Sequence, residues 1–341
     1  MIKKNISYIG LDIGGANLKV VGLNRNKKII FVEQFKCPIW RGTDVLVDKF
    51  KIFKNLNPEA LMGITMTGEL CDNFLNREDG VKKIIGCTQK IKCLKYFFTN
   101  NKDRFKKKPS HKQVASMNWL ATAEFISKKI TNGLIVDFGS TTIDLILIKN
   151  KKCANIFFDD FNRINNSELI YTGCTRTPIF GITNQVILKK KIYNIIPEFF
   201  SNTADLYRAI KILPDDLDLY ESADGKNKSR TNSLRRVARN FGLDYNTGNK
   251  SLILKLCKKL ISIQLNNLHL IINKIFSKNN FFNKTTPIIL CGIGKSIIKL
   301  GKQKYNFVNF EDLLYVNSKK NTCASYHAPA TSCALLISEL K

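Results

Sequence analysis

The chain carries IGLDIGGANLKVVGL at residues 9–23 and LIVDFGSTTIDLILI at residues 134–148. Each segment is an apolar strand that ends in Asp, followed by a turn that contains glycine and by a second strand. Glycine lets backbone N–H groups approach phosphate oxygens, and a neighbouring carboxylate can hold a hydrated divalent cation against them. We therefore expect the two hairpins to face each other and to grip a phosphate chain from both sides.

The length and composition indicate an ordinary soluble protein. A chain of 341 residues is long enough for about two domains, each with its own core. Hydrophobic content of 44% and aromatic content of 10% are typical of globular proteins. The first residues, MIKKNISYIG, lead into a strand without the apolar region of a signal peptide. No apolar run approaches the roughly 20 residues of a membrane span. We expect a cytoplasmic protein without a membrane partner.

The net charge of +28 suggests anionic partners, but the basic residues do not form a nucleic-acid motif. Of the 55 basic residues, 11 are Arg and 44 are Lys, and they are dispersed along the chain. The densest run, KDRFKKK at residues 102–108, is typical of a solvated loop. An AT-rich coding sequence produces the same excess of Lys. We expect a field that attracts anionic substrates, and no specific nucleic-acid partner.

The cysteines do not form a metal-binding pattern. Ten are scattered without a C-x-x-C pair, and the chain has three His. Structural zinc sites use closely spaced Cys and His, so a zinc site is not expected. Several Cys lie in apolar stretches, where a small buried thiol is the simpler interpretation.

The two halves of the chain share one order of elements. The first half predicts three strands, then alternating helix and strand, then a closing helix, at residues 7–13, 18–23, 28–35, 43–53, 60–66, 81–98 and 116–128. The pattern restarts with strands at 134–138, 143–148 and near 153–158. Ordinary doubly wound folds begin strand–helix–strand, so three opening strands distinguish this chain from them. The sequence predicts two copies of one α/β unit.

The rest of the second half is mainly helical before a last strand. Residues 201–275 predict helices around a loop at 222–232, with a long amphipathic run over 252–276. A strand at 287–291 then meets the glycine turn GIGKSI, which opens a helix. The final segment, HAPATSCALLISEL, predicts a helix that starts at Pro and is rich in small residues.

Three segments together, DIGGANLK, DFGSTTID and LCGIGKS, resemble the actin/hexokinase/heat-shock-ATPase superfamily. The resemblance implies an α/β fold with two RNase-H-like (actin-like ATPase) domains around a central cleft. It places the first phosphate loop in an N-terminal domain, residues 1–130, which the C-terminal helix 327–341 joins. Residues 131–326 form the C-terminal domain with the second phosphate loop and a helical insert at about 201–275.

Further segments narrow the resemblance: GLDIGGANLKV, TMTGELCD, NWLATA, YTGCTRTP, SADG, RRVARNFGLD and HAPATS. These segments run through nearly the whole chain. They are similar to the hydantoinase/oxoprolinase-related proteins of tetrahydromethanopterin-linked C1 transfer, a family that includes enzymes of methanofuran biosynthesis. The resemblance implies a transferase that condenses an aminomethylfuran-methyl diphosphate with a phenolic amine of tyramine or tyrosine type and releases diphosphate. The product would serve methanofuran or methylofuran assembly. The alternative is an ATP-dependent hydrolase or small-molecule kinase of the same fold.

The implied cofactor is Mg²⁺, and ATP is not expected in the leading interpretation. The implied partners are the small-molecule diphosphate and the phenolic amine, and a homodimer stays open.

In the first hairpin, Asp12 is a candidate metal ligand and catalytic carboxylate that would hold Mg²⁺ through water. The candidate phosphate-binding residues are those of the turn and the next strand: Gly14, Gly15, Ala16, Asn17 and Lys19. The alternative is a purely structural β-hairpin.

In the second hairpin, Asp137 is the candidate catalytic carboxylate and metal ligand. Backbone and hydroxyl donors for phosphate are expected from Gly139, Ser140, Thr141 and Thr142. Asp144 is either a third metal ligand or a charge on the strand. Departure of diphosphate requires that its charge be neutralised, which a metal ion and these donors would supply.

Other candidates lie outside the hairpins. A phenol has an ordinary pKa near 10, so a base should help it attack, and Glu69 or Asp137 is suited to that role. Glu69 could equally be an ordinary carboxylate at a strand end. Arg176 would clamp diphosphate with two hydrogen bonds, or form a surface ion pair. Asp224 is either a metal or amine contact in the substrate pocket or part of a turn.

The late glycine turn is the last candidate. Gly292 and Gly294 mark a change from strand to helix that lies against adenosine in ATP-using relatives of the superfamily. Without ATP, the turn is expected beside the furan or phenol ring.

Overall fold

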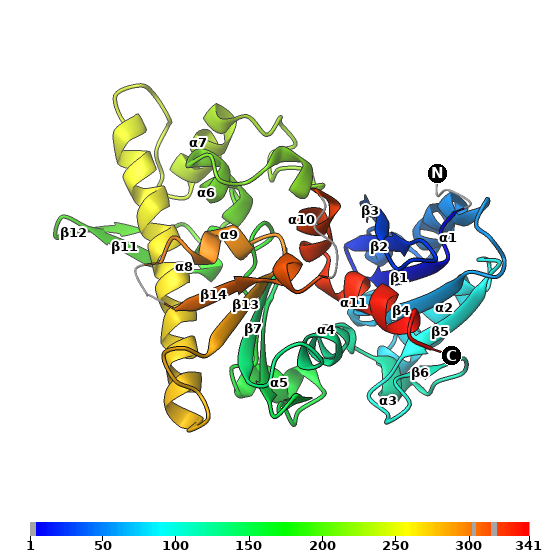
Figure 1. Ribbon diagram of the computed structural model, residues 1–341. Helices are drawn as coiled ribbons and strands as arrows, with labels where there is room; N and C mark the ends of the chain where they lie inside the picture. The colour runs from blue at the N-terminus through cyan, green and yellow to red at the C-terminus, as the bar shows by residue number, and fades with distance from the viewer. Residues whose placement is uncertain (1–4, 302–304, 315–318, 341) are drawn as a thin grey trace.

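The computed structural model describes residues 5–301, 305–314 and 319–340. It forms two lobes, each built on a central sheet with helices against it (Figure 1). Within these ranges, no helix combines the length and the apolar character needed to cross a membrane.

The first lobe contains a six-stranded sheet in the order β3-β2-β1-β4-β5-β6. Its strands are β1 (Tyr8–Ile13), β2 (Asn17–Leu23), β3 (Ile29–Lys36), β4 (Leu61–Met66), β5 (Leu94–Phe98) and β6 (Phe105–Lys106). β1 runs antiparallel to β2 and parallel to β4. The helices of this part of the chain are α1 (Asp44–Phe50), α2 (Arg77–Thr88), α3 (His111–Val114) and α4 (Asn118–Ser127).

The second sheet repeats this arrangement. Its order is β10-β8-β7-β13-β14, with the short β9 paired to β8. The strands are β7 (Gly133–Phe138), β8 (Ile143–Lys149), β9 (Lys152–Cys153), β10 (Leu169–Ile170), β13 (Pro287–Cys291) and β14 (Asn306–Asn309). β7 is antiparallel to β8 and parallel to β13, as β1 is to β2 and β4. The two glycine hairpins therefore occupy equivalent positions in the two sheets.

Helices of the second half cover this sheet and extend beyond it. They are α5 (Asp160–Asn165), α6 (Thr203–Ala209), α7 (Arg230–Arg239), α8 (Lys250–Lys278) and α9 (Lys295–Ile298), together with the hairpin of β11 (Gln185–Leu188) and β12 (Lys191–Asn194). The apolar side chains of α8 share a core with β7 and β13. Figure 1 shows α8, in yellow, crossing the outer side of this lobe.

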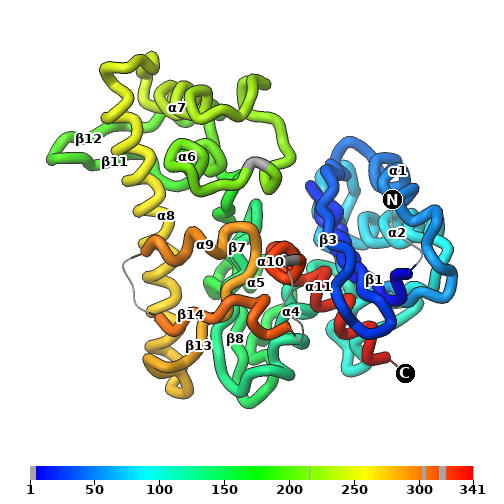
Figure 2. Tube along the Cα trace, turned by 45° about the horizontal axis from the view of Figure 1, so that its top comes forward, coloured from blue at the N-terminus to red at the C-terminus, as the bar shows by residue number. Residues whose placement is uncertain are grey.

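An apolar core between the sheets is shared by both lobes. Two further helices, α10 (Lys319–Ser325) and α11 (Ala328–Ile337), lie with α4 between the lobes (Figure 2). The shared core joins α4 and α11 to residues of both sheets, such as Val21 and Ile146. α11 packs closely on β1, because a Cβ at Gly10 would lie 1.8 Å from the carbonyl oxygen of Ala330. The small residues of the last segment therefore serve a close helix–sheet contact.

One predicted strand is much shorter than expected. A strand was expected near 153–158, but β9 ends at Cys153. The side chain of Asn155 takes the place of a backbone partner: it accepts from Leu147 N at 2.7 Å and donates to Leu145 O at 3.2 Å. Because the amide side chain satisfies the edge of β8, the chain leaves the sheet there. The other predicted elements are present with ends shifted by a few residues, and the boundary between domains near residue 130 stays a prediction.

Candidate functional site

A cavity of about 580 Å³ brings the two glycine turns together. The first hairpin contributes its turn and Lys19, and the second contributes Asp137, the turn from Gly139 to Thr142, and Asp144. The predicted residues that line the cavity are Gly14, Gly15, Ala16, Asn17, Lys19, Asp137, Gly139, Ser140, Thr141, Thr142, Asp144 and Arg176. Five predicted residues do not line it: Asp12, Glu69, Asp224, Gly292 and Gly294.

The first turn is fixed by backbone hydrogen bonds. Gly14 N donates to Asn17 O at 3.0 Å and closes the turn. Ile39 N donates to Gly15 O at 2.9 Å, which ties the turn to the chain that follows β3. Gly15 is closely packed, since a Cβ there would lie 2.8 Å from Cys71 Sγ. The turn is thus held in place without any ligand.

Asp12 lies behind this turn, paired with Lys19. The two residues are opposite each other in the β1–β2 ladder, and Lys19 Nζ lies 3.0 Å from Asp12 Oδ2. The Asp12 side chain is 1% exposed, and its Oδ1 has no hydrogen-bond partner among the described residues. Burial alone would lower the pKa of Lys19, but the nearby carboxylates, Asp12 first, raise it above its ordinary value. The structure therefore gives Asp12 the position of a counter-ion for Lys19, one layer back from the cavity.

The second turn is braced by the segment YTGCTRTP. Gly139 N donates to Thr142 O at 2.9 Å, which closes the turn as in the first hairpin. Thr175 N and Arg176 N donate to Ser140 O at 3.1 and 3.0 Å. Gly173 permits this approach, because a Cβ there would lie 2.1 Å from Ser140 O. A segment quoted above for its resemblance thus has a definite structural role.

Asp137 and Asp144 form a carboxylate pair in the cavity. They are opposite each other in the β7–β8 ladder, so two like charges face one another. Burial, with the charge of Asp144, raises the pKa of Asp137 to about 7. Burial also raises the pKa of Asp144, although Arg163 opposes this at 2.9 Å. Arg163 is 2% exposed, and its guanidinium lies 4.1 Å from the centre of the Trp119 ring.

Asp137 and Asp144 suit a magnesium ion better than Asp12 does. Mg²⁺ keeps several waters and is usually held by one or two carboxylates together with substrate phosphates. Two carboxylates beside a cavity match that preference, and a bound cation would oppose the burial that raises the pKa of both. Within the described ranges, no group of three His, Cys, Asp or Glu forms a protein-only cage.

Arg176 connects the two hairpins. Its Nη1 lies 3.5 Å from Thr141 Oγ1, and its guanidinium lies 5.3 Å from the Trp40 ring centre and 5.4 Å from that of Tyr220. The Tyr220 hydroxyl donates to Ala16 O, so the second lobe contacts the first turn. The aromatic rings hold the guanidinium by cation–π contact, and its N–H groups are available to an anion. In the described part of the chain, Arg176 forms no surface ion pair, the alternative considered above.

Glu69 lies beneath the cavity floor. It is in the short 3₁₀ turn Gly68–Leu70 after β4 and is 1% exposed. Its Oε1 accepts a hydrogen bond from Ser116 Oγ at 2.8 Å, and Ser116 lines the cavity. Burial raises the pKa of Glu69 to about 7. Glu69 therefore meets the cavity wall through Ser116, and its role as a base stays a prediction.

The other three predicted residues are held elsewhere. Asp224 accepts from Arg236 at 3.0 Å in a buried network on the helical side of the second lobe, and this ion pair favours the turn over a substrate contact. A Cβ at Gly292 would lie 2.4 Å from Asp137 Oδ1, and one at Gly294 would lie 2.5 Å from the Phe138 ring. These glycines thus let the last turn pack under β7, and the expectation that they lie beside a substrate ring is not supported by the lining of the cavity.

The sequence interpretation missed half of the cavity wall. The lining residues without a predicted role are Trp40, Thr67, Leu70, Cys71, Asp72, Ser116, Asn118, Asp160, Arg163, Leu169, Tyr171 and Pro329. Several lie in the segments TMTGELCD, NWLATA, YTGCTRTP and HAPATS, which served for the resemblance, so the clustering of those segments was an available signal. Trp40 and Asp160 lie in no such segment, and only the fold brings them to the site.

Comparison with known proteins agrees with the architecture. The model of the hydantoinase/oxoprolinase family matches residues 61–324. A (4-{4-[2-(gamma-L-glutamylamino)ethyl]phenoxymethyl}furan-2-yl)methanamine synthase of Methanocaldococcus jannaschii is 28% identical over 313 residues, covering 90% of this chain and 92% of that protein. The enzyme of the same name from Methanococcus vannielii is 29% identical, covering 63% of this chain and 95% of that protein.

Among solved structures, nucleotide-free acetone carboxylase aligns with 97% of this chain and 70% of its own, at a TM-score of 0.56 and 8% identity. This likeness concerns the fold alone and agrees with the paired sheets. The expected α/β fold with two RNase-H-like units of actin-like ATPase type is confirmed. With three quarters of its length matched by the family model, this chain belongs to the hydantoinase/oxoprolinase family.

Proposed function

We propose that this protein is a transferase that joins the methyl carbon of an aminomethylfuran-methyl diphosphate to the phenol oxygen of a tyramine-type amine, with release of diphosphate. The proposal starts from the name of the Methanocaldococcus jannaschii relative, which describes a furan-methanamine that carries a phenoxymethyl group. That group is an aryl ether. Its formation from a phenol requires a furan-methyl carbon with a leaving group, and diphosphate is a leaving group for which this cavity has suitable donors.

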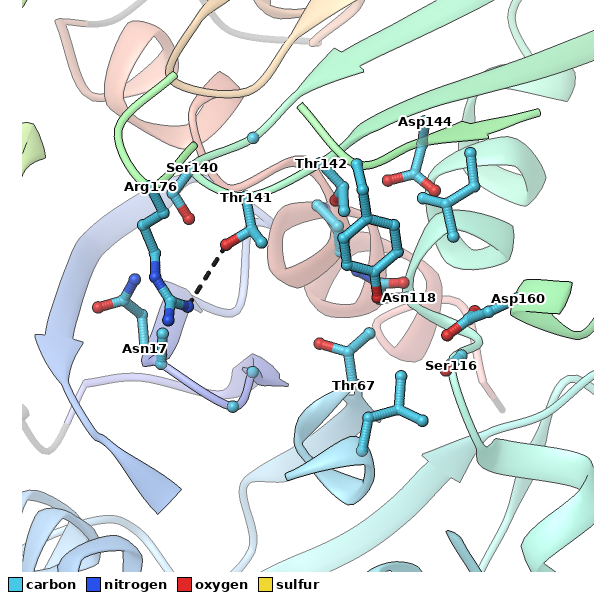
Figure 3. A pocket seen from close by; sticks show the side chains of 18 of the residues that line it. Asn17, Thr67, Ser116, Asn118, Ser140, Thr141, Thr142, Asp144, Asp160 and Arg176 are labelled. Carbon is cyan, nitrogen blue, oxygen red and sulfur yellow. Dashed lines mark hydrogen bonds between the residues drawn. The ribbon is translucent and has the colours of Figure 1, made fainter. Parts of the chain in front are cut away.

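One observation carries the proposal: donors for an oxyanion gather at one end of the cavity. Figure 3 shows Asn17, Ser140, Thr141 and Arg176 on the same side. Hydrogen bonds from a guanidinium to phosphate oxygens are charge-assisted, each contributing roughly 1.5–3 kcal/mol. The same donors retain the departing diphosphate, whose negative charge increases as the C–O bond breaks.

The carboxylate pair lines the same cavity. Asp137 and Asp144 would hold Mg²⁺, which when bound supplies positive charge to the diphosphate oxygens. Lys19, oriented by Asp12 at 3.0 Å, presents a second positive charge from the opposite hairpin. The substrate's own diphosphate thus takes the place that ATP phosphates occupy in kinases of this fold, and the proposed reaction does not use ATP.

The chemistry of the furan ring fits a site built mainly for the leaving group. A furan-methyl cation is stabilised by resonance with the ring oxygen, so breaking of the C–O bond can precede attack. Donors preorganised around the diphosphate then lower part of the barrier, and removing a single such donor from an enzyme typically slows turnover by about 10²–10³-fold.

The direct test is to incubate the protein with aminomethylfuran-methyl diphosphate, glutamyl-tyramine and Mg²⁺, without ATP. Mass spectrometry should detect the ether, and a phosphate assay should detect one diphosphate per ether. Parallel reactions with tyramine and tyrosine identify the acceptor, and a reaction with chelator tests the need for the metal. Absence of ether, together with ADP release from ATP and another substrate, would favour the alternative hydrolase or kinase.

A further inference from the structure

We propose that Ser116 and Glu69 form a proton-accepting pair at the acceptor end of the cavity. Ser116 Oγ takes the proton of the phenol while passing its own proton to Glu69, so Ser116 is a catalytic residue and Glu69 acts through it. This inference rests on the proposed function, because it assigns the base for the phenol in that reaction.

The backbone of Ser116 is the first observation. It adopts φ 55°, in the left-handed region that residues other than glycine rarely occupy. Such conformations are energetically unfavourable and concentrate at functional sites. Here the conformation lies just before α4 and places the hydroxyl in the cavity wall, 2.8 Å from Glu69 Oε1.

The carboxylate behind Ser116 is the second observation. Glu69 is 1% exposed, and its Oε2 has no hydrogen-bond partner among the described residues. Ser116 Oγ donates to Oε1, so the carboxylate is the acceptor of the pair. A buried carboxylate stays ready to accept a proton when its pKa lies near the working pH, and burial raises the pKa of Glu69 to about 7.

The surroundings of Glu69 explain why burial dominates. Its backbone packs against α2, where a Cβ at Gly80 would lie 2.6 Å from Glu69 O. The charged groups that act on it are Asp160 of α5 and Arg77 of α2, which pair with each other at 3.1 Å across the lobes. Cys71 and Tyr171 are the other titratable groups coupled to Glu69.

The position of Ser116 separates the base from the leaving group. In Figure 3, Ser116 and Asp160 lie on the side of the cavity away from Ser140 and Arg176. A furan-methyl carbon between these ends would have diphosphate on one side and the phenol on the other. This is the arrangement that displacement requires, because the nucleophile and the leaving group occupy opposite sides of the carbon.

The step balances without any further reactant. The phenol O–H bond breaks, its proton goes to Ser116 Oγ, and the proton of Ser116 goes to Glu69. The phenol oxygen forms the C–O bond to the furan-methyl carbon, while the bond from that carbon to diphosphate breaks and diphosphate leaves with the electron pair. Glu69 then returns its proton through Ser116 to solvent.

The test uses Ser116→Gly and Glu69→Gln in the full chain. Glycine removes the hydroxyl but accepts the left-handed backbone, and Gln keeps the size of Glu. We expect kcat to fall by about 10²–10³-fold in both variants, while KM for the furan diphosphate changes less than about threefold. Ser127→Ala is the matched control, since Ser127 Oγ donates to Glu124 O away from this cavity, and its kcat should equal that of the wild type.

Two readouts separate proton transfer from a structural role. The wild-type kcat should rise with pH through about 7 as Glu69 ionises, and Glu69→Gln should lose this rise. Fluorinated tyramines have more acidic phenols, so they should raise the kcat of both variants at least tenfold above the value with tyramine. Unchanged pH profiles, or no gain with fluorinated acceptors, would overturn the proton pair.

Failure of this inference is distinct from failure of the proposed function. If the wild type forms no ether, the proposed function fails. If the wild type forms ether and both variants match it, only the assignment of Ser116 and Glu69 fails. Circular dichroism and thermal unfolding establish whether each variant is folded. If Glu69→Gln does not fold, the pH profile of Ser116→Gly and its response to fluorinated acceptors test the proton pair.

Discussion

The two glycine hairpins share a backbone but differ in charge. In each, an Asp at the end of the first strand faces the residue seven positions later, and the turn closes through one hydrogen bond, at 3.0 Å in the first and 2.9 Å in the second. The first hairpin pairs Asp12 with Lys19, whereas the second pairs Asp137 with Asp144. The same geometry therefore yields a neutral pair in one lobe and a doubly acidic pair in the other.

This difference shows how two hairpins with the same backbone geometry can have different electrostatic roles. Opposite charges compensate each other in the first hairpin, where Lys19 pairs with Asp12 Oδ2 and also lines the cavity. Like charges do not, and the second hairpin depends on Arg163 for part of its compensation. We infer that the remaining negative charge is what the proposed metal ion and the positively charged side of the cavity neutralise.

The largest expected effect comes from breaking the acidic pair. Asp137→Asn should reduce ether formation by at least about 10²–10³-fold, because it removes a carboxylate of the proposed metal site. The fold should persist, since Asn relieves like-charge repulsion. Turnover by mass spectrometry and thermal unfolding check both parts, and near-normal turnover would remove the metal role. Asp12→Asn, the matched change in the first hairpin, should slow turnover much less.

The next largest effect is expected when Asp144 loses the positive charge of Arg163. Arg163→Met should lower the free energy of unfolding by roughly 3 kcal/mol, because a buried carboxylate loses its cation. Adding Asp144→Asn should recover much of this loss, which urea unfolding of both variants would measure. Lys51→Met is the control: its ion pair with Asp48 is exposed, so the change should stay below about 0.5 kcal/mol. No recovery in the double variant would show that Arg163 acts through its contacts with Trp119 or Glu168 instead.

A smaller effect is expected at the residue that joins the hairpins. Arg176→Lys keeps the charge but loses the planar fork and its contacts with Trp40 and Tyr220. We expect KM for the furan diphosphate to rise about tenfold, equivalent to about 1.4 kcal/mol, with kcat less affected. Steady-state kinetics with varied diphosphate substrate would measure it. An unchanged KM would place the diphosphate elsewhere.

The smallest expected effect concerns how the free energy of unfolding changes with pH in the absence of metal. Because burial raises the folded pKa of Asp137 to about 7, above its unfolded value of 3.8, the folded state binds more protons between about pH 4 and 7. Stability should therefore fall as pH rises through this window and level off above it. In chelator, Asp137→Asn should lessen the fall between pH 5 and 7 by roughly 1 kcal/mol. Parallel curves for the two proteins would contradict the raised pKa.

Much of the fold could be predicted because it depends on local patterns. Apolar runs that end in Asp and glycine identify both hairpins, and the small residues from Ala328 onward indicate a helix that approaches a sheet closely. The strand expected near 153–158 failed because an amide side chain, Asn155, replaced a ladder partner. Side-chain substitution of this kind leaves no periodic signal in the sequence.

The candidate site was predictable at the turns but not at its walls. The residues of the two glycine turns are fixed by the hairpins that contain them, so their positions follow from the pattern. Asp224 is also a carboxylate that could bind a metal ion or an amine, yet Arg236 holds it in another network. Glu69 was a candidate base, and Ser116, 47 residues later in the chain, donates a hydrogen bond to it at the cavity wall.

The sequence by itself determined the two paired strands, their turns and the carboxylates at fixed positions beside them, because these depend on neighbours within a few residues. Only the tertiary structure decided which carboxylates face the cavity and which partner each one has. Asp12 meets Lys19 within its own hairpin, but Asp144 meets Arg163 and Glu69 meets Ser116 through chain folding. Burial and charge arise from such contacts, and they decide the pKa and hence the chemistry of each group.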